Sequence, residues 1–230
     1  MPTARPICRH VRLDGLVEYA ACSELQRRLA RQRMLGQIPD TLLLLEHSPV
    51  VTIGRSGSGA GLLVPAEALQ VRGIATCETE RGGKVTYHGP GQLVGYPILD
   101  LGGLRRDVHW YLRQLEEVLI RALADFGLSA ERRDGLTGVW VSALPNARRS
   151  GKVAAIGVAV RRWVTMHGFA LNVCCDLTPF SLIDPCGLAD LGVTSMAEAL
   201  GHSVSLDDVL DSIVGAFGQT FGLEMVRAAL

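Results

Sequence analysis

Residues 81–92 read RGGKVTYHGPGQ, and residues 93–101 continue as LVGYPILDL. The first part holds four glycines and one proline in twelve residues. Gly82-Gly83 and Gly89-Pro90-Gly91 are turn signals, and the residues between them favour a strand. The second part is an apolar run with the length of a buried strand. The pattern predicts a short strand between two glycine-rich loops, followed by a core strand.

The short strand carries a concentration of polar side chains, namely Arg81, Thr86, Tyr87 and His88. Glycines beside them would let the backbone approach a ligand closely. A tight turn with incidental polar residues is the alternative interpretation. We favour a binding site here, in which Arg81 holds a carbonyl group or a loop in place.

Apolar periodicity on both sides of this stretch indicates further elements. Strands are expected at 8–13, 41–46, 50–54, 73–78, 128–133, 137–142, 151–163 and 165–174, and helices at 15–35, 65–71, 107–127, 195–200 and 205–221. Asp14, Asp107 and Ser205 are the expected helix caps. The prediction is an α/β fold of the α+β type, with a mixed, largely antiparallel sheet flanked by helices. Residues 1–230 are expected to form a single domain.

The whole-chain composition narrows the function. The 230 residues are 48% hydrophobic and 20% charged, with a formal net charge of zero, which does not suit a dedicated nucleic-acid binder. Neither a signal peptide nor an apolar run of about 20 residues is visible. The six cysteines lack a disulfide or metal-site spacing, so reduced thiols, a cytoplasmic location and no metal are expected.

Four motifs in order carry a family resemblance: RGGKVTYHGPGQ at 81–92, GKVAAIG at 151–157, HGFALNV at 167–173 and DPCGL at 184–188. A weaker match is LEHSPVVTIGR at 45–55. Together they resemble the lipoyl(octanoyl) transferases, also called the lipoate-protein ligase B family. The resemblance implies a fold like that of the biotin and lipoate protein ligases. Lys84 and Asp184 depart from the family pattern, which has Gln and often Asn at those positions.

Cys186 is the predicted nucleophile. It lies in the turn Asp184-Pro185-Cys186-Gly187, whereas a structural cysteine is more typical of an apolar run. A free thiol has a pKa near 8.5, so only about 3% is thiolate at pH 7. Lys152, beside Gly151 and an apolar strand, is the candidate cation and base; a solvent-exposed lysine at a strand edge is the alternative. The resemblance implies a Cys186/Lys152 acyltransferase dyad.

The resemblance also implies the substrates. An octanoyl group would pass from acyl carrier protein to Cys186, and then to a lysine of a lipoyl domain of the 2-oxoacid dehydrogenases or of the glycine cleavage H protein. No cofactor is implied, and the glycine-rich segment 55–61 lacks the Gly-Lys-Ser/Thr ending of a P-loop. The implied pocket residues are Arg81, Gly82, Gly83, Lys84, Val85, Thr86, Tyr87, His88, Ala155, Ile156, Gly157, Gly168, Phe169 and Ala170.

Several alternatives stay open from the sequence. His47, His88 and His167 could support the dyad or simply be satisfied core histidines. Gly157 and Gly168 are expected to leave room for an acyl chain against the backbone, and backbone N–H groups of 81–92 and of the Cys186 turn are expected to bind an oxyanion. An ATP-dependent ligase, a fatty-acyl-binding protein without catalysis and a thioesterase are the rival functions.

Overall fold

The computed structural model describes residues 5–57, 61–142, 151–184 and 192–230. Part of the expected 55–61 loop and the predicted nucleophile Cys186 lie outside the described residues. In the described part of the chain, no helix is long and apolar enough to cross a membrane.

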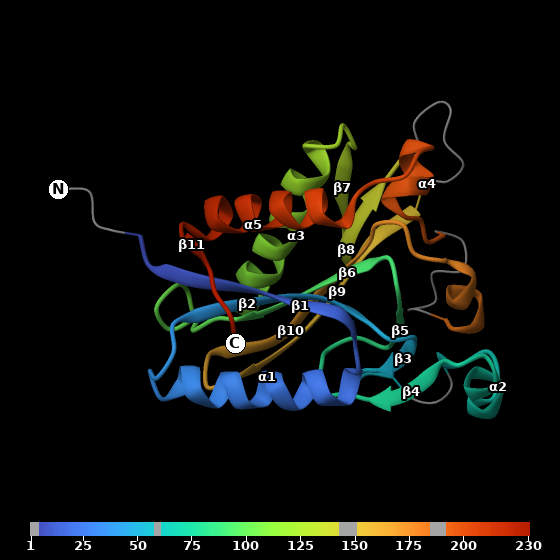
Figure 1. Ribbon diagram of the computed structural model, residues 1–230, viewed down its shortest axis with the longest axis horizontal. Helices are drawn as coiled ribbons and strands as arrows, with labels where there is room; N and C mark the ends of the chain where they lie inside the picture. Colours follow the sequence, from blue (N-terminus) through green and yellow to red (C-terminus); the bar gives the residue numbers. More distant parts are fainter. Residues whose placement is uncertain (1–4, 58–60, 143–150, 185–191) are drawn as a thin grey trace.

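A large mixed sheet forms the centre of the molecule (Figure 1). Its strand order is β11-β1-β2-β6-β10-β9-β8-β7. Strand β1 pairs in parallel with β2 and β11, and the other pairs are antiparallel. The strands are β1 (Ile7–Val17), β2 (Asp40–His47), β6 (Gln92–Ile98), β7 (Ala130–Arg133), β8 (Leu136–Val141), β9 (Gly151–Arg161), β10 (Val164–Asn172) and β11 (Glu224–Arg227). The predicted fold class, with its largely antiparallel sheet, is confirmed.

A smaller sheet with the strand order β4-β3-β5 lies at one end of the large one (Figure 1). Its strands are β3 (Val50–Ile53), β4 (Ala75–Glu78) and β5 (Val85–His88). Helix α2 (Ala66–Val71) and the 3₁₀ helix η2 (Thr178–Leu182) lie at the same end. The polar strand predicted between two glycine-rich loops is therefore β5, in the small sheet, while the apolar run after it becomes β6, in the large sheet.

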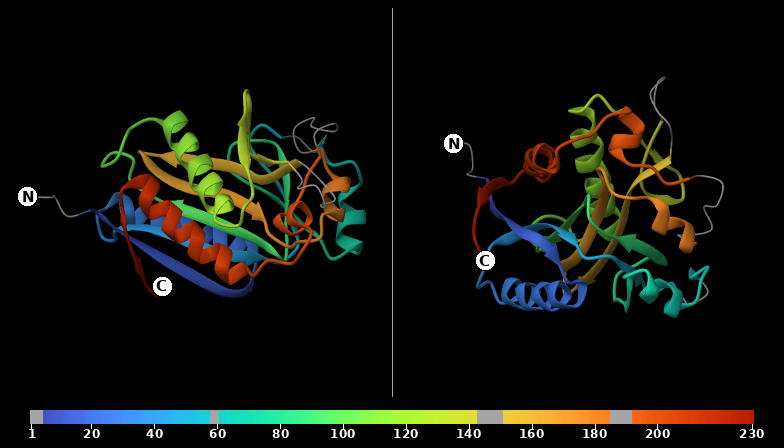
Figure 2. Two further views of the ribbon diagram at one scale, coloured as in Figure 1. Left: turned by 90° about the horizontal axis from the view of Figure 1, so that it is seen from above. Right: turned by 45° about the vertical axis from the view of Figure 1, so that its right-hand side comes forward.

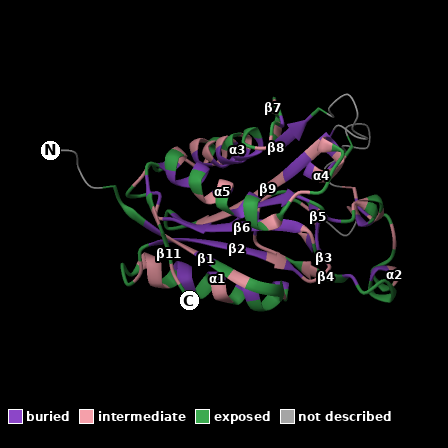
Figure 3. Ribbon diagram, turned by 45° about the horizontal axis from the view of Figure 1, so that its top comes forward, coloured by how far each residue is buried: buried purple, intermediate pink, exposed green. Residues whose placement is uncertain are grey.

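Helices cover both faces of the large sheet (Figure 2). Helices α3 (Val108–Ala124) and α5 (Leu206–Phe221) lie on one face, and α1 (Tyr19–Met34) lies on the other. Strand β2 contains an uninterrupted apolar run at 42–45 because Leu42 and Leu44 pack toward α3 and α5, whereas Leu43 and Leu45 pack toward α1. The strands between these layers are buried, and the outer surfaces of the helices are exposed (Figure 3).

The helix caps were predicted with mixed success. The Asp107 carboxylate accepts a hydrogen bond from the Trp110 N–H at 2.9 Å, and the Ser205 hydroxyl accepts one from Asp208. The Asp14 cap was wrong: β1 continues past it to Val17, and α1 begins after Glu18. A register irregularity between Arg12 and Leu16 lets β1 keep its pairing with β2.

Two elements escaped the sequence analysis. Strand β11 pairs with β1 from the opposite end of the chain, and η2 carries the sequence TPFSL. Neither has a periodic apolar pattern. Helix α4 (Met196–Leu200), which precedes α5, was expected.

His47 is a structural residue that ties three strands of the large sheet. Its side chain is fully buried. Its Nδ1 donates to the Val17 carbonyl at 2.7 Å, so its Nε2 accepts from the Tyr96 hydroxyl, also at 2.7 Å. Burial lowers the pKa of His47 to about 4, so the ring is neutral at pH 7.

Because His47 is buried and neutral, we expect the protein to lose stability in acid. Below its ordinary pKa of 6.5 the unfolded state takes up a proton, whereas the folded state excludes it down to pH about 4. The contribution of neutral His47 to the free energy of unfolding is therefore fully present above about pH 6.5 and is lost as the pH drops toward 4. Between pH 7 and pH 5 this loss amounts to about 2 kcal/mol. Urea unfolding of the wild type and of His47→Leu at both pH values measures that share.

We expect His47→Leu to be less stable at pH 7 but to lose about 2 kcal/mol less on acidification than the wild type. His202→Leu is the matched control, because His202 is exposed. Equal acid sensitivity of the His47→Leu variant and the wild type would contradict the assignment.

Candidate active site

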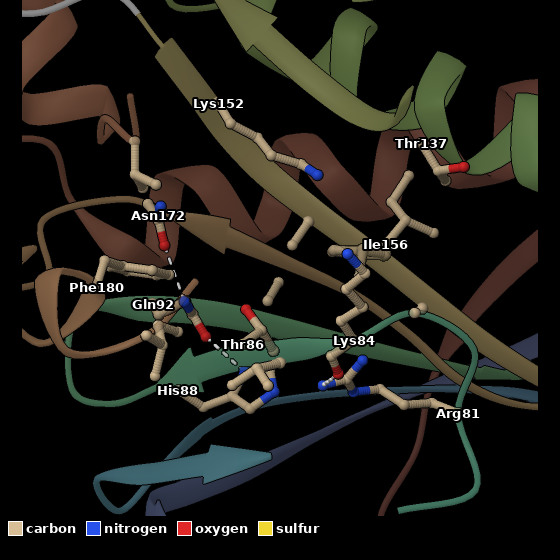
Figure 4. Close-up of a pocket in the computed structure, with 18 of the residues that line it drawn as sticks. Arg81, Lys84, Thr86, His88, Gln92, Thr137, Lys152, Ile156, Asn172 and Phe180 are labelled. Carbon is tan, nitrogen blue, oxygen red and sulfur yellow. Dashed lines mark hydrogen bonds between the residues drawn. The ribbon is translucent and has the colours of Figure 1, made fainter. Parts of the chain in front are cut away.

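A cavity of about 600 Å³ lies between the large sheet and the small one. Strands β9 and β10 form one wall, β5 and the loop before it form another, and η2 with residues 192–193 closes a side (Figure 4). The cavity is lined by these predicted site residues: Arg81, Gly83, Lys84, Val85, Thr86, His88, Lys152, Ala155, Ile156, Gly157, His167, Gly168, Phe169 and Ala170.

Of the predicted site residues that the structure describes, three do not line the cavity: Gly82, Tyr87 and His47. Tyr87 lies between Thr86 and His88 on β5, and successive strand residues point to opposite faces. Its ring packs edge-on against Phe180, with ring centroids 5.6 Å apart, inside the apolar cluster of the small sheet. Position within a motif therefore did not guarantee contact with the cavity.

Arg81 holds the loop before β5 in place. Its buried guanidinium donates to the Thr52 carbonyl at 2.8 Å, the Thr52 hydroxyl at 2.8 Å and the Lys84 carbonyl at 3.2 Å. The next residue along, Gly82, donates its N–H to Val158 on β9 at 2.9 Å. Arg81 thus acts on the loop, as expected, and the loop is tied to both sheets.

The glycines of the two walls make room mainly for protein. A side chain at Gly157 would meet the Gly82 carbonyl at 2.9 Å, and one at Gly168 would meet the Gly95 carbonyl at 2.2 Å. Both glycines line the cavity, so the expectation that they leave space for an acyl chain stays a prediction, and the direction in which a side chain would project is occupied by neighbouring backbone. Gly157 is needed for the loop before β5 to approach the large sheet, and Gly168 for the close packing of β10 against β6 within that sheet.

A chain of buried hydrogen bonds crosses the base of the cavity. Gln92 Oε1 accepts from His88 Nδ1 at 2.7 Å, and Gln92 Nε2 donates to Asn172 Oδ1 at 2.8 Å (Figure 4). Asn172 Nδ2 then donates to the Thr194 carbonyl at 3.0 Å. Burial, followed by the charge effects of His47 and Arg81, lowers the pKa of His88 well below 6.5. His88 is therefore a neutral imidazole whose Nδ1 carries the proton.

His167 lines the cavity in an unusual backbone conformation. Its φ of +57° is rare for a residue with a side chain, and its N–H donates to Gln26 of α1 at 2.8 Å. Both ring nitrogens lack a hydrogen-bond partner among the described residues. Burial lowers the pKa of His167 to about 4, so this ring is also neutral at pH 7.

Lys84 and Lys152 are the only lysines in the sequence, and both line the cavity. The Lys152 side chain extends from β9 with its amine toward the cavity (Figure 4). Its backbone pairs with the segment after the Cys186 motif, because its N–H donates to the Gly192 carbonyl and its carbonyl accepts from Thr194. Lys152 is thus held on β9 from two sides.

Cys186 belongs to the segment 185–191, outside the described residues, but both ends of that segment lie at the cavity. Asp184 and Gly192 are lining residues. The Asp184 N–H donates to the Gly61 carbonyl at 2.9 Å, and Ile183 forms an isolated bridge with Leu62. The last described residue before this segment and the first one after it therefore both line the same cavity as Lys152.

Several backbone groups are already committed. The N–H of Gly82 donates to Val158, and the N–H of Gly91 donates to the Glu46 carboxylate at 2.7 Å. These two groups of the 81–92 stretch are not available to an oxyanion. No group of three or more His, Cys, Asp or Glu side chains within the described residues is arranged to hold a metal ion.

Sequence reasoning missed part of the lining. Gln92, Tyr96 and Asn172 supply polar groups from the core strands β6 and β10, and Leu177, Phe180 and Ser181 come from around η2. Tyr19 contributes from the start of α1. The motif HGFALNV at 167–173 contains Asn172, and a polar residue at the end of an apolar strand was a usable signal. The η2 residues had none.

Solved structures share this fold. A bi-partite lipoate protein ligase from Thermoplasma acidophilum superposes with a TM-score of 0.73 at 19% identity, covering 98% of this chain and 88% of that one. A lipoate-protein ligase A bound with ATP superposes with a TM-score of 0.76 at 18% identity, covering 97% and 89%. At these identities the likeness concerns the fold alone.

Sequence comparison is more specific. Residues 18–218 match the lipoyl protein ligase A/B catalytic domain. An octanoyltransferase of Geobacter metallireducens is 51% identical over 203 residues, which cover 88% of this chain and 89% of the relative. An octanoyltransferase of Solibacter usitatus is 51% identical over 215 residues, or 94% of each chain. The chain therefore belongs to the lipoyl protein ligase A/B catalytic-domain family, within its octanoyltransferase group.

Proposed function

We propose that the protein transfers an octanoyl group from acyl carrier protein to the side-chain amine of a lysine in a lipoyl domain, through a thioester on Cys186. The relatives named octanoyltransferase support the reaction. One observation carries the mechanism: Lys152 and both flanks of the Cys186 segment, Asp184 and Gly192, line one cavity. Two residues span at most about 7 Å, so Cys186 can reach the cavity wall from Asp184.

The first half-reaction moves the acyl group onto the enzyme. The Cys186 thiolate attacks the carbonyl carbon of the octanoyl thioester, and the carrier thiol leaves when the tetrahedral intermediate collapses. Lys152, as a cation, stabilises the thiolate and then protonates the departing sulfur. The donor bond is already a thioester, so the step needs no ATP.

The second half-reaction releases the product. The acceptor amine attacks the Cys186 thioester, its proton passes to Lys152, and the Cys186 thiolate leaves as the amide forms. Burial lowers the pKa of His88 and of His167, so at pH 7 these rings are not cations in the first step and are weak bases in the second. Lys152 is therefore the assigned proton carrier of both steps.

The cavity has the chemical character required for the acyl tail. Ala155, Ile156, Phe169, Ala170 and Phe180 place apolar groups along its walls. Burying the methylene groups of an octanoyl tail contributes about 5 kcal/mol, at roughly 0.8 kcal/mol per group. The acceptors we propose are the lipoyl domains of 2-oxoacid dehydrogenases and the glycine cleavage H protein.

Intact-protein mass spectrometry tests the covalent step. We expect one octanoyl adduct after incubation with octanoyl-acyl carrier protein without ATP, located by peptide mapping to the Cys186 peptide. The adduct should be removed by hydroxylamine, as a thioester is, and should disappear when a lipoyl domain is added. Cys186→Ala should form no such adduct.

The other outcomes separate the rival functions. Transfer to the lipoyl domain without any adduct on Cys186 would contradict the thioester intermediate. Transfer only from free octanoate with ATP would indicate a ligase, release of free octanoate a thioesterase, and octanoyl binding without transfer a binding protein. An amide on Lys84 or Lys152 would resist hydroxylamine and so be distinguished from the thioester.

Substitution of Lys152 separates its two roles. Lys152→Ala removes both the cation and the base, so both half-reactions should slow by about 10²- to 10⁴-fold. Lys152→Arg keeps a cation that cannot act as a base, so it should retain more of the acylation step than of the transfer to the acceptor amine. Single-turnover measurement of each half-reaction gives the two rates.

Arg121→Gln is the matched control for loss of a positive charge, because Arg121 is exposed on α3 and pairs with Glu117. It should keep both wild-type rates. If Lys152→Ala keeps the wild-type rates of both half-reactions, Lys152 has no role in the mechanism, whether or not Cys186 is acylated.

A further inference from the structure

Trp140 and Lys152 are direct partners across the β8–β9 pair. Residues opposite each other in an antiparallel pair project to the same face of the sheet and touch. The Lys152 Nζ lies 4.9 Å from the centroid of the Trp140 ring. That separation is within the range of a cation–π contact, and tryptophan is the strongest of the aromatic partners.

The surroundings of Trp140 are unusual for a core tryptophan. Its side chain is fully buried, yet in the described part of the chain it belongs to none of the three apolar clusters. A second cation contacts the same ring, since the Arg133 guanidinium lies 5.7 Å from its centroid. The ring Nε1 has no acceptor among the described residues. Within the described residues, both Lys152 and Arg133 therefore place a cation against this ring.

The lack of a side chain at Gly138 leaves room for the stem of Lys152. Gly138 on β8 has φ +132°, and a side chain there would lie 2.5 Å from Lys152 Cε and 2.7 Å from the Ala154 carbonyl. The register of β8 on β9 shifts between Val139 and Trp140. This irregularity sets the lysine against glycine on one side and tryptophan on the other.

A buried carboxylate holds Gly138 in place. Glu116 on α3 is 1% exposed, and its Oε1 accepts the Gly138 N–H at 3.2 Å. Arg113 at 2.8 Å and Arg132 at 3.2 Å neutralise the carboxylate. Helix α3 thereby holds β8 at Gly138, the residue that the Lys152 side chain packs against.

We infer that Trp140 is a positioning residue of the reaction, which holds the Lys152 ammonium over its ring and so keeps a cation at the cavity that both flanks of the Cys186 segment line. This inference rests on the role proposed above for Lys152. The ring face attracts the charged form of the amine and not the neutral one. A tethered cation favours the thiolate of Cys186 more than a mobile one does, because the electrostatic effect falls with distance.

The pH dependence of Cys186 alkylation by iodoacetamide tests the inference, with the Cys186 peptide followed by mass spectrometry. Loss of the ring in Trp140→Leu should move the midpoint upward by about half to one pH unit, while Trp140→Phe, with a weaker ring, should move it less. At a pH about one unit or more below the wild-type midpoint, the alkylation rate of Trp140→Leu should fall about three- to tenfold. Thermal melting checks that each variant is folded. If Trp140→Leu is not folded, the result for Trp140→Phe decides the test.

Two further variants give the control and the coupling. Arg133→Gln removes the other cation from the same ring and should leave the Cys186 midpoint unchanged. In a Lys152→Ala background, Trp140→Leu should add no further shift, since its effect acts through the lysine.

A shifted midpoint in Lys152→Ala with wild-type midpoints in Trp140→Leu and Trp140→Phe would overturn the inference alone. An unshifted Lys152→Ala would overturn the dyad, and the role of Trp140 with it. An equal shift from Trp140→Leu with and without Lys152 would show a general packing effect and would also overturn the inference.

Discussion

The buried guanidinium of Arg81 is the interaction on which the cavity depends. It binds Thr52 and the Lys84 carbonyl within the small sheet, while its neighbour Gly82 binds Val158 on the large sheet. A cavity between two sheets exists only if they are held at a fixed separation, and the close approach at Gly157 sets that separation. A buried arginine is well suited to this role because its planar group donates several hydrogen bonds in fixed directions.

The cavity holds two neutral imidazole rings and two lysine amines. Burial keeps His88 and His167 uncharged, so they contribute shape and hydrogen bonding at neutral pH. The two lysines supply amine groups on the walls, and Lys152 is supported by Trp140, Gly138 and, through Gly138, by Glu116. This division suits chemistry in which one amine moves protons while the surrounding walls bury an apolar tail.

Much of the architecture was predictable because its signals are local. Continuous apolar runs indicated β2 and β6, and the apolar face and Asp107 cap indicated α3. Where the signal depended on distant residues, prediction failed. Asp14 looked like a helix cap, but pairing of Leu16 and Val17 with β2 carries the strand beyond it. Strand β11 is short and partly polar, and it exists because β1 offers an edge from the other end of the chain.

The sequence by itself determined the family and the mixed sheet with its helices, and it nominated candidate residues for acyl transfer, because composition, periodicity and motif order are properties of the chain. Only the tertiary structure decided which of them share the cavity. It placed Lys152 and His88 there and left Tyr87 and His47 in the core. It also joined Trp140 to Lys152 across two strands. Strand register and sheet separation are set by long-range packing, and no local pattern encodes them.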